Sequence, residues 1–310
     1  MKVTKRQYGK KTGFTIIELL TVMSIIIILI SVLVPGLALA RRYAKRVKQK
    51  AQFHSISVAM EQFNADQGGG YPDSGLMGAA APFTTGAQRL AEALMGRDRR
   101  GYDPQSSWDA ALDSANLDIY ASLANGSSVP QITASLDRRR GPYLSDVAAF
   151  QVSELYGPAY AGPVYGGAVG TPPAPVLTDE YTVKNITVGG KAVKAGSPVL
   201  YYKANVSSKV FPDPNLPIAI GDPPISIINS LDNEALVALG TINNAAIPHH
   251  FAFGYTDLTT GKTGFQIFYE AIRNPQMSPP WPYNQESYIL ISAGYDGIFG
   301  TKDDVFNFGE

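Results

Sequence analysis

The sequence predicts an α+β fold in which one long N-terminal helix, half of it transmembrane, packs on an antiparallel β-sheet that has a large loop-rich insertion. Three observations lead to this prediction. Residues 19–40 form an apolar run without a charge, and residues 41–67 continue with apolar side chains at helical spacing. Residues 68–310 combine short β-like runs with Gly and Pro at about one residue in five.

Charge is distributed unevenly along the chain. The sequence holds 26 Lys and Arg and 26 Asp and Glu, yet eleven of the basic residues and only one acid fall within residues 1–50. The remaining 260 residues therefore have 15 basic against 25 acidic side chains. This balance speaks against a body that binds nucleic acid, and it suits a basic membrane-flanking end attached to an acidic exported body.

The chain has no cysteine and only three histidines. Disulfides, Cys-ligated metals, thiol catalysis and a lipidated cysteine are thereby excluded. No Gly-x-Ser-x-Gly, His-Glu-x-x-His or Walker sequence occurs, so we expect no enzymatic activity. A membrane-tethered enzyme is the alternative, but the adjacent His249 and His250 are poor zinc ligands because sequence neighbours point apart.

Residues 14–40 are expected to form the transmembrane half of the long helix. The 22 residues from Leu19 to Ala40 extend roughly 33 Å at about 1.5 Å per residue, enough to cross a hydrocarbon core of about 30 Å. The basic residues ahead of this run place the N-terminus in the cytoplasm and the body outside it. A secretory signal peptide removed after Ala40 is the alternative, although the apolar run is long for such a peptide.

One carboxylate, Glu18, stands at the start of the apolar run, within the segment Lys10-Lys11-Thr12-Gly13-Phe14-Thr15-Ile16-Ile17-Glu18. This segment resembles the prepilin leader of type IV pilins and type II secretion pseudopilins, which a membrane peptidase cleaves after the glycine. The resemblance implies a pilin-like fold, a leader at residues 1–13, and cleavage by prepilin peptidase between Gly13 and Phe14. It also implies N-methylation of the new amine and a single-pass protein of the inner (cytoplasmic) membrane, with its body periplasmic or extracellular.

Cleavage leaves an ammonium at Phe14, which can pair with Glu18 of a neighbouring subunit in a bundle of packed helices. Each charge is then neutralised at low dielectric, where an unpaired charge is costly. The resemblance therefore implies a structural subunit of a type II secretion or type IV pilus-like filament, homo-oligomeric or hetero-oligomeric. Its partners would be the peptidase, an assembly platform with its ATPase motor, and membrane lipid. The alternative for Glu18 is local pairing with Lys10 and Lys11.

Pro35, followed by Gly36, predicts a break in the helix as a bend or a melted turn, because proline removes a backbone hydrogen bond. The exposed half of the helix follows at residues 41–67. It opens with six basic residues in positions 41–50, which hold lipid headgroups, pair with acids of a neighbour, or face solvent. Its apolar side chains form one face that should pack on the sheet, and Gly68–Gly70 should end the helix. These side chains are Phe53, Ile56, Met60 and Phe63.

Residues 68–310 are expected to form a globular domain with an insertion at about 73–260. We predict helices at 85–95 and 232–239, strands at 181–188, 191–202, 265–272 and 285–291, and a hairpin turn at Gly189-Gly190. The arginines at 97–100 and 138–140 are interpreted as exposed loop charge, with binding of an anion or of an acid of a neighbour as the alternative. The insertion has no counterpart in major pseudopilins, so the alternative function is a minor or tip subunit whose insertion binds a substrate, glycan or surface.

The loop at residues 291–305 places Asp296, Asp303 and Asp304 around tight glycine turns. Calcium favours six to eight hard oxygen ligands of this kind. The loop is similar to the calcium loop near the end of type II secretion major pseudopilins. By that resemblance the three aspartates supply side chains to Ca²⁺, and carbonyls come from around Ile291 and Ser292. The alternative is an Asp/Gly turn that binds no ion.

Overall fold

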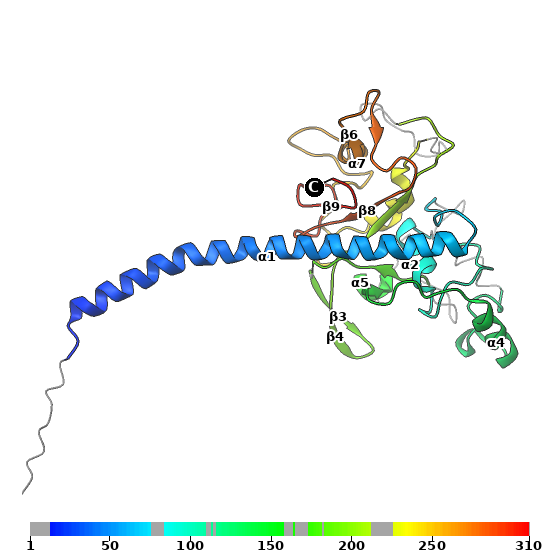
Figure 1. Ribbon diagram of the computed structural model, residues 1–310, viewed down its shortest axis with the longest axis horizontal. Helices are drawn as coiled ribbons and strands as arrows, with labels where there is room; N and C mark the ends of the chain where they lie inside the picture. The colour runs from blue at the N-terminus through cyan, green and yellow to red at the C-terminus, as the bar shows by residue number, and fades with distance from the viewer. Residues whose placement is uncertain are drawn as a thin grey trace, which may run out of the picture. The chain divides into compact units, whose positions relative to one another are not determined.

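The structure is a computed structural model that describes residues 13–75, 84–109, 113, 116–157, 164, 173–181, 183–211 and 226–309 (Figure 1). The chain divides into two compact units, the first ending at Ala44 and the second beginning at Lys45. Helices and small antiparallel sheets occur together, which is compatible with the predicted α+β class. Of the predicted leader, only Gly13 belongs to the described residues.

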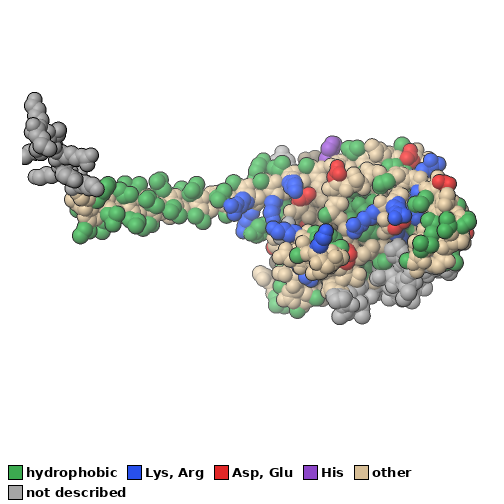
Figure 2. All heavy atoms as spheres, turned by 90° about the horizontal axis from the view of Figure 1, so that it is seen from below, with side chains coloured by type: hydrophobic (Ala, Val, Ile, Leu, Met, Phe, Trp, Pro, Cys, Tyr) green, Lys and Arg blue, Asp and Glu red, His purple; other side chains and the backbone are tan. Residues whose placement is uncertain are grey.

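Helix α1 covers Ile16–Asp66 and includes the whole predicted apolar run. Among the described residues it is the one helix that is long and apolar enough to cross a membrane. Every side chain from residue 13 to residue 44 is exposed within the chain, and Figure 2 shows hydrophobic side chains along this part of the helix. Such a surface needs an apolar environment, because no other part of the described chain covers it.

The second half of α1 packs on the body through the predicted face. Phe53, Ile56, Met60 and Phe63 are each at most 3% exposed. Gln49 and Gln52 extend this face with polar contacts: Gln52 Nε2 donates to the Thr178 carbonyl at 2.8 Å. The helix ends at Asp66, and Gly68–Gly70 follow with positive φ angles, so the predicted helix end is confirmed.

The central sheet has three antiparallel strands in the order β5 (Leu200–Lys203), β8 (Tyr288–Ser292) and β9 (Val305–Phe306). Alternate residues face two separate core clusters, as the period of two requires. Tyr201 and Leu290 belong to the cluster that contains the α1 face, whereas Leu200 and Ile291 belong to the cluster that contains Phe268. The sheet is therefore buried on both faces, with α1 on one of them.

Three two-stranded pairs complete the described strands. They are β1 (Ala149–Phe150) with β2 (Val176–Leu177), β3 (Lys184–Val188) with β4 (Lys191–Ala195), and β6 (Arg273–Asn274) with β7 (Trp281–Pro282). The predicted hairpin is confirmed, because Gly189 and Gly190 join β3 to β4 with φ angles of +56° and +79°. Positive φ at both positions is what a type I′ turn requires.

The other described helices are short: α2 (Gly86–Met95), the 3₁₀ turn η1 (Leu123–Asn125), α4 (Val129–Arg138), α5 (Val152–Tyr156), the 3₁₀ turn η2 (Ser230–Asn233), α6 (Glu234–Val237) and α7 (Gly264–Ile272). The predicted helices at 85–95 and 232–239 are confirmed as α2 and as η2 with α6. Helix α4 was not predicted.

Two strand predictions are wrong. Residues 265–272 form helix α7, because Phe265, Phe268, Tyr269 and Ile272 bury one helical face. Residues 191–202 are two strands in different sheets: β4 ends at Ala195, and β5 begins at Leu200. Between them Pro198, which has no N–H to donate, forms only an isolated bridge with Thr178.

Candidate functional site

The start of α1 holds Glu18 against its own helix terminus. The backbone N–H and the hydroxyl of Thr15 both donate to Glu18 Oε2 at 2.8 Å, and the Glu18 N–H donates to Thr15 Oγ1 at 3.3 Å. This is a capping box, in which the residue before the helix and the acid three positions later satisfy each other's backbone donors. The carboxylate also lies at the positive end of the helix dipole.

Capping is a role of Glu18 that the sequence analysis did not include, although Thr-x-x-Glu before an apolar run is its usual signal. Within the described part of the chain, Glu18 has these hydrogen bonds and no ion pair. Lys10 and Lys11, the alternative partners, lie outside the described residues. Phe14 is 84% exposed. Cleavage after Gly13 would place an ammonium directly beside this capping box.

Pro35 lies inside α1, and the helix continues through it. A melted turn at Pro35 is therefore wrong, whereas a bend of the helix at this residue stays a prediction. Proline removes the single hydrogen bond to the carbonyl of residue 31, while the bonds of the neighbouring turns stay in place. A loss of one bond in a helix of 51 residues does not interrupt it.

The basic segment, residues 41–50, follows the apolar run on the same helix (Figure 2). Its last part is bound to the body of the same chain. Lys48 forms an ion pair with Glu180 at 2.6 Å, and Lys50 Nζ donates to the Gly309 carbonyl at 3.1 Å. Gln49 Oε1 accepts the Glu180 N–H at 2.8 Å. These contacts attach α1 to the segment that precedes β3.

The loop at residues 293–304 joins β8 to β9, whose register pairs Ser292 with Val305. The carboxylate of Asp303 accepts hydrogen bonds from backbone N–H groups of this loop. Its Oδ2 accepts the N–H groups of Tyr295 at 2.6 Å and Asp296 at 3.0 Å. Asp296 in turn accepts the N–H of Ile298 at 2.8 Å. Such bonds are what a turn without a metal would make.

Asp304 is the buried acid of the loop, with 6% of its surface exposed. Its Oδ2 accepts the Gly300 N–H at 2.8 Å, whereas Oδ1 has no hydrogen-bond partner. Burial raises the pKa of Asp304 well above its usual range, and the charges of Asp303 and Asp296 add to the shift. A buried carboxylate oxygen without a donor is costly, and a cation would satisfy it.

Ser292 donates its hydroxyl to Asp179 Oδ2 at 2.8 Å, so this hydroxyl is already used. Asp179 is 6% exposed and also accepts the N–H groups of Tyr181 and Ser197. Burial raises the pKa of Asp179 well above its usual range. No sequence pattern points to this acid, because 113 residues separate it from Ser292.

The structure thus brings Asp296, Asp303 and Asp304 into one loop. Burial, together with the nearby Asp303, raises the pKa of Asp296, as expected for carboxylates held close together. Among the described residues, however, no group of three or more His, Asp or Glu side chains is gathered in a metal-binding arrangement. The oxygen chemistry fits calcium, and the unpartnered oxygen of Asp304 fits it best.

One arginine of each cluster, Arg97 and Arg139, is buried, so the interpretation as exposed loop charge is wrong for these two; the remaining arginines are exposed or half-buried. Arg97 is 1% exposed and forms ion pairs with Glu92 at 3.0 Å and Asp113 at 2.6 Å. Arg139 forms an ion pair with Asp98. Each cation is buried because a carboxylate offsets the loss of its hydration. These arginines hold the insertion together.

His249 is a structural residue. It is 2% exposed, and its Nδ1 accepts the Phe299 N–H at 3.1 Å. Burial lowers its pKa to about 4, which keeps the ring neutral at ordinary pH. The His250 ring stacks on Tyr255, with ring centroids 4.4 Å apart.

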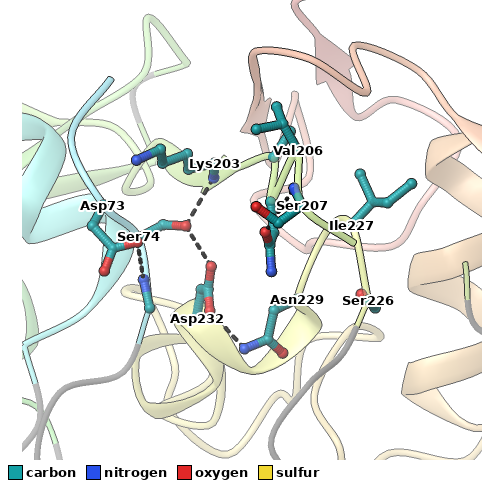
Figure 3. Close-up of a pocket in the computed structure, with 12 residues that line it drawn as sticks. Asp73, Ser74, Lys203, Val206, Ser207, Ser226, Ile227, Asn229 and Asp232 are labelled. Atoms are coloured by element: carbon teal, nitrogen blue, oxygen red, sulfur yellow. Dashed lines mark hydrogen bonds between the residues drawn. The ribbon is translucent and has the colours of Figure 1, made fainter. Parts of the chain in front are cut away.

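A polar pocket of about 380 Å³ lies between the end of β5 and η2 (Figure 3). Ser74 and Asp232 point toward one another in it: the Ser74 hydroxyl donates to Asp232, and the Lys203 N–H donates to Ser74 Oγ at 2.8 Å. Asn229 Nδ2 donates to the other oxygen of Asp232 at 2.7 Å. Burial raises the pKa of Asp232 to about 7. The polar groups of Ser74 and Asp232 are therefore directed at each other and not at a ligand.

Comparison of the chain with protein-family models, with curated proteins and with solved structures finds no match.

Proposed function

We propose that the protein is a structural subunit of a type II secretion or type IV pilus-like filament, with a pilin-like fold. The proposal rests on the sequence from Gly13 to Glu18 at the start of the apolar helix α1. The protein is held in the inner membrane by this helix, with its N-terminus in the cytoplasm and its body outside. Prepilin peptidase removes residues 1–13, and an assembly platform with its ATPase motor moves the subunit into the filament.

The proposed assembly contact joins Glu18 to the Phe14 ammonium of a neighbouring subunit. In the precursor, Phe14 has an amide and no charge, so the contact cannot form. After cleavage, a subunit in register neutralises both charges, and a subunit out of register leaves both unpaired in an apolar surrounding. The ion pair therefore selects the register of the helices more than it adds stability.

Glu18→Gln tests this contact, because it removes the negative charge of residue 18 and keeps the capping box. Glutamine at the same position also closes a capping box, so the start of α1 is kept while the charge is lost. We expect normal membrane insertion and normal cleavage at Gly13, measured by the mass of the mature chain, and at least a tenfold loss of subunits in sheared filaments. Normal incorporation of Glu18→Gln would refute the proposal, and so would a native chain that begins at Met1 or Arg41.

Thr15→Ala is the matched control. It removes the hydroxyl of the cap and keeps the charge, so we expect filament incorporation between that of the wild type and that of Glu18→Gln. If Thr15→Ala, which keeps the charge, fails as completely as Glu18→Gln, then the charge of Glu18 is not sufficient for assembly and the proposed role of the ion pair is contradicted.

We further propose that the loop at residues 293–304 binds Ca²⁺ through Asp304, together with Asp296 and Asp303. The support is the buried Asp304 Oδ1 without a partner. A ligand present at 100 times its Kd stabilises a fold by about 2.7 kcal/mol. Calcium should therefore raise the melting temperature of the wild type relative to chelator, and it should have little effect on Asp304→Asn. Equal melting of the wild type in both conditions would exclude the site.

A minor or tip subunit is the second candidate function, favoured by apolar side chains at the surface of the insertion. Leu123 is 76% and Val129 67% exposed, at η1 and the start of α4 (Figure 1). Both tryptophans, by contrast, pack against the core, as the stacking of Trp108 on Tyr102 at 4.9 Å shows. A Leu123→Asp, Val129→Asp variant should form filaments normally but lose secretion or attachment. Unchanged secretion and attachment would remove this candidate.

A further inference from the structure

A second pocket, of about 670 Å³, opens on the body between α6 and residues 248–259. Two acids line it, Glu234 and Asp257, together with the ring of Tyr255 and apolar side chains that include Pro248 and Leu258. Leu258 is fully exposed at the rim. The pocket thus combines negative charge with an apolar wall.

The carboxylate of Glu234 has no ion pair among the residues that the structure describes. Its Oε1 accepts the Phe253 N–H at 2.9 Å, and burial raises its pKa to about 7. Asp257 is half-buried, and the N–H groups of Thr259 and Thr260 donate to its Oδ1 at 2.7 and 2.8 Å. These backbone bonds lower the pKa of Asp257, so it is ionised.

No Lys, Arg or His is among the described residues that line this pocket. Two described basic groups close in sequence have other contacts: the His250 ring stacks on Tyr255, and Lys262 forms an ion pair with Glu270 at 2.7 Å. The charge of His250 helps to lower the pKa of Asp257, but neither Asp257 nor Glu234 has an ion pair within the described part of the chain. A ligand with an aliphatic stem and a cationic head, such as a Lys or Arg side chain, matches the apolar wall and the acids together.

The chain itself supplies such side chains in the basic segment, which has six Lys and Arg in ten residues. Lys48 and Lys50 are bound within their own subunit, whereas Arg41 is exposed and has no partner among the described residues. The charges of the two parts are also complementary, because the body has an excess of acidic side chains and the basic segment has an excess of basic ones.

We propose that the pocket at Glu234 and Asp257 receives a basic side chain from residues 41–50 of a second copy of the chain. This inference rests on the proposed filament function, and it adds a contact made outside the membrane to the one made by Glu18. An ion pair at this place orients the bodies, because like charges brought together in a wrong register repel each other.

The absence of cysteine makes a cross-linking test clean. Ala44→Cys and Thr259→Cys are introduced singly into two co-expressed full-length copies, which keeps every charge of the contact. A short bis-maleimide added to filaments should join the two copies, and neither copy with itself. Leu123→Cys in place of Thr259→Cys is the matched control, because Leu123 is exposed but remote from the pocket in sequence, and it should give no product.

Charge reversal then tests the acid. Glu234→Lys should lower the cross-linked product by about tenfold, and Arg41→Glu in the other copy should restore it. Melting of Glu234→Lys is measured in parallel, and Glu234→Gln replaces it if the lysine variant does not fold. Filaments that form normally without the cross-link, or a cross-link unaffected by either Glu234 variant, would overturn this inference and leave the filament function standing. The filament function is tested separately by Glu18→Gln, for which loss of filaments is expected. Failure of the pocket contact can therefore be distinguished from failure of the filament function.

Discussion

Asp232→Asn tests how one buried acid sets the pH dependence of the body. Asp232 is 3% exposed, and its two oxygens accept hydrogen bonds from Asn229 and Ser74 (Figure 3). Asparagine fills the same space and keeps both bonds, because its oxygen can accept from Asn229 while its NH₂ donates to the Ser74 hydroxyl oxygen. The variant therefore removes the titration and little else.

The magnitude follows from the pKa of Asp232, which burial raises from 3.8 to about 7. The folded protein thus holds this proton more tightly than the unfolded chain does. The stabilising contribution is complete below the unfolded pKa and is lost as the pH rises through about 7. A difference of about 3 pKa units corresponds to a free energy on the order of 4 kcal/mol.

The assay is unfolding of the full chain in detergent micelles between about pH 4 and pH 9, followed by tryptophan fluorescence. Trp108 and Trp281 both lie in the body, so the signal reports the body and not the membrane helix. The wild type should lose stability toward high pH by about 4 kcal/mol more than Asp232→Asn. Glu234 and His249 titrate in both proteins, so their effects cancel in the difference. Parallel stability curves for the two proteins would refute the reasoning.

Three further substitutions are measured by the same fluorescence assay. Phe63→Ala removes a ring that is 3% exposed between α1 and the body, and we expect a loss of about 3–5 kcal/mol; a loss below about 1 would show that α1 is not packed there. Arg97→Ala leaves Glu92 and Asp113 buried without a cation and should also cost about 3–5 kcal/mol, so a neutral result would contradict the buried ion pairs. Lys48→Ala breaks an exposed ion pair and should cost less than about 1 kcal/mol; a larger loss would mean that this pair fastens α1.

Helices α2 and α7 show which local signals predict structure and how they can be misinterpreted. Both begin with a capping box, formed by Thr85 with Gln88 and by Thr263 with a glutamine three residues later. The first was predicted because alanine and leucine follow it and Gly96 ends it. For the second, the aromatic and β-branched residues favour a strand, although their spacing of three and four residues is helical.

Long-range pairing is the part that the sequence could not predict. The aspartates of the calcium-type loop and the residues around Glu18 are adjacent in sequence, so their proximity was expected. Asp113 lies 16 residues from Arg97, and Asp179 lies 113 residues from Ser292. Whether such a charge is exposed or buried depends on partners that only the fold brings together, which is why Arg97 was wrongly placed at the surface.

The capping box also bears on the proposed assembly contact, because cap and ion pair do not compete for the same oxygen. Both hydrogen bonds from Thr15 reach Glu18 Oε2, which leaves Oε1 to accept from another donor. An ionised carboxylate has room for about four donors. The cap thus fixes the rotamer of Glu18 before a neighbour arrives, and the entropy of ordering that side chain is not lost on assembly. A variant without the Thr15 hydroxyl keeps the charge but must order it on binding, and for this reason Thr15→Ala should assemble less well than the wild type and better than Glu18→Gln.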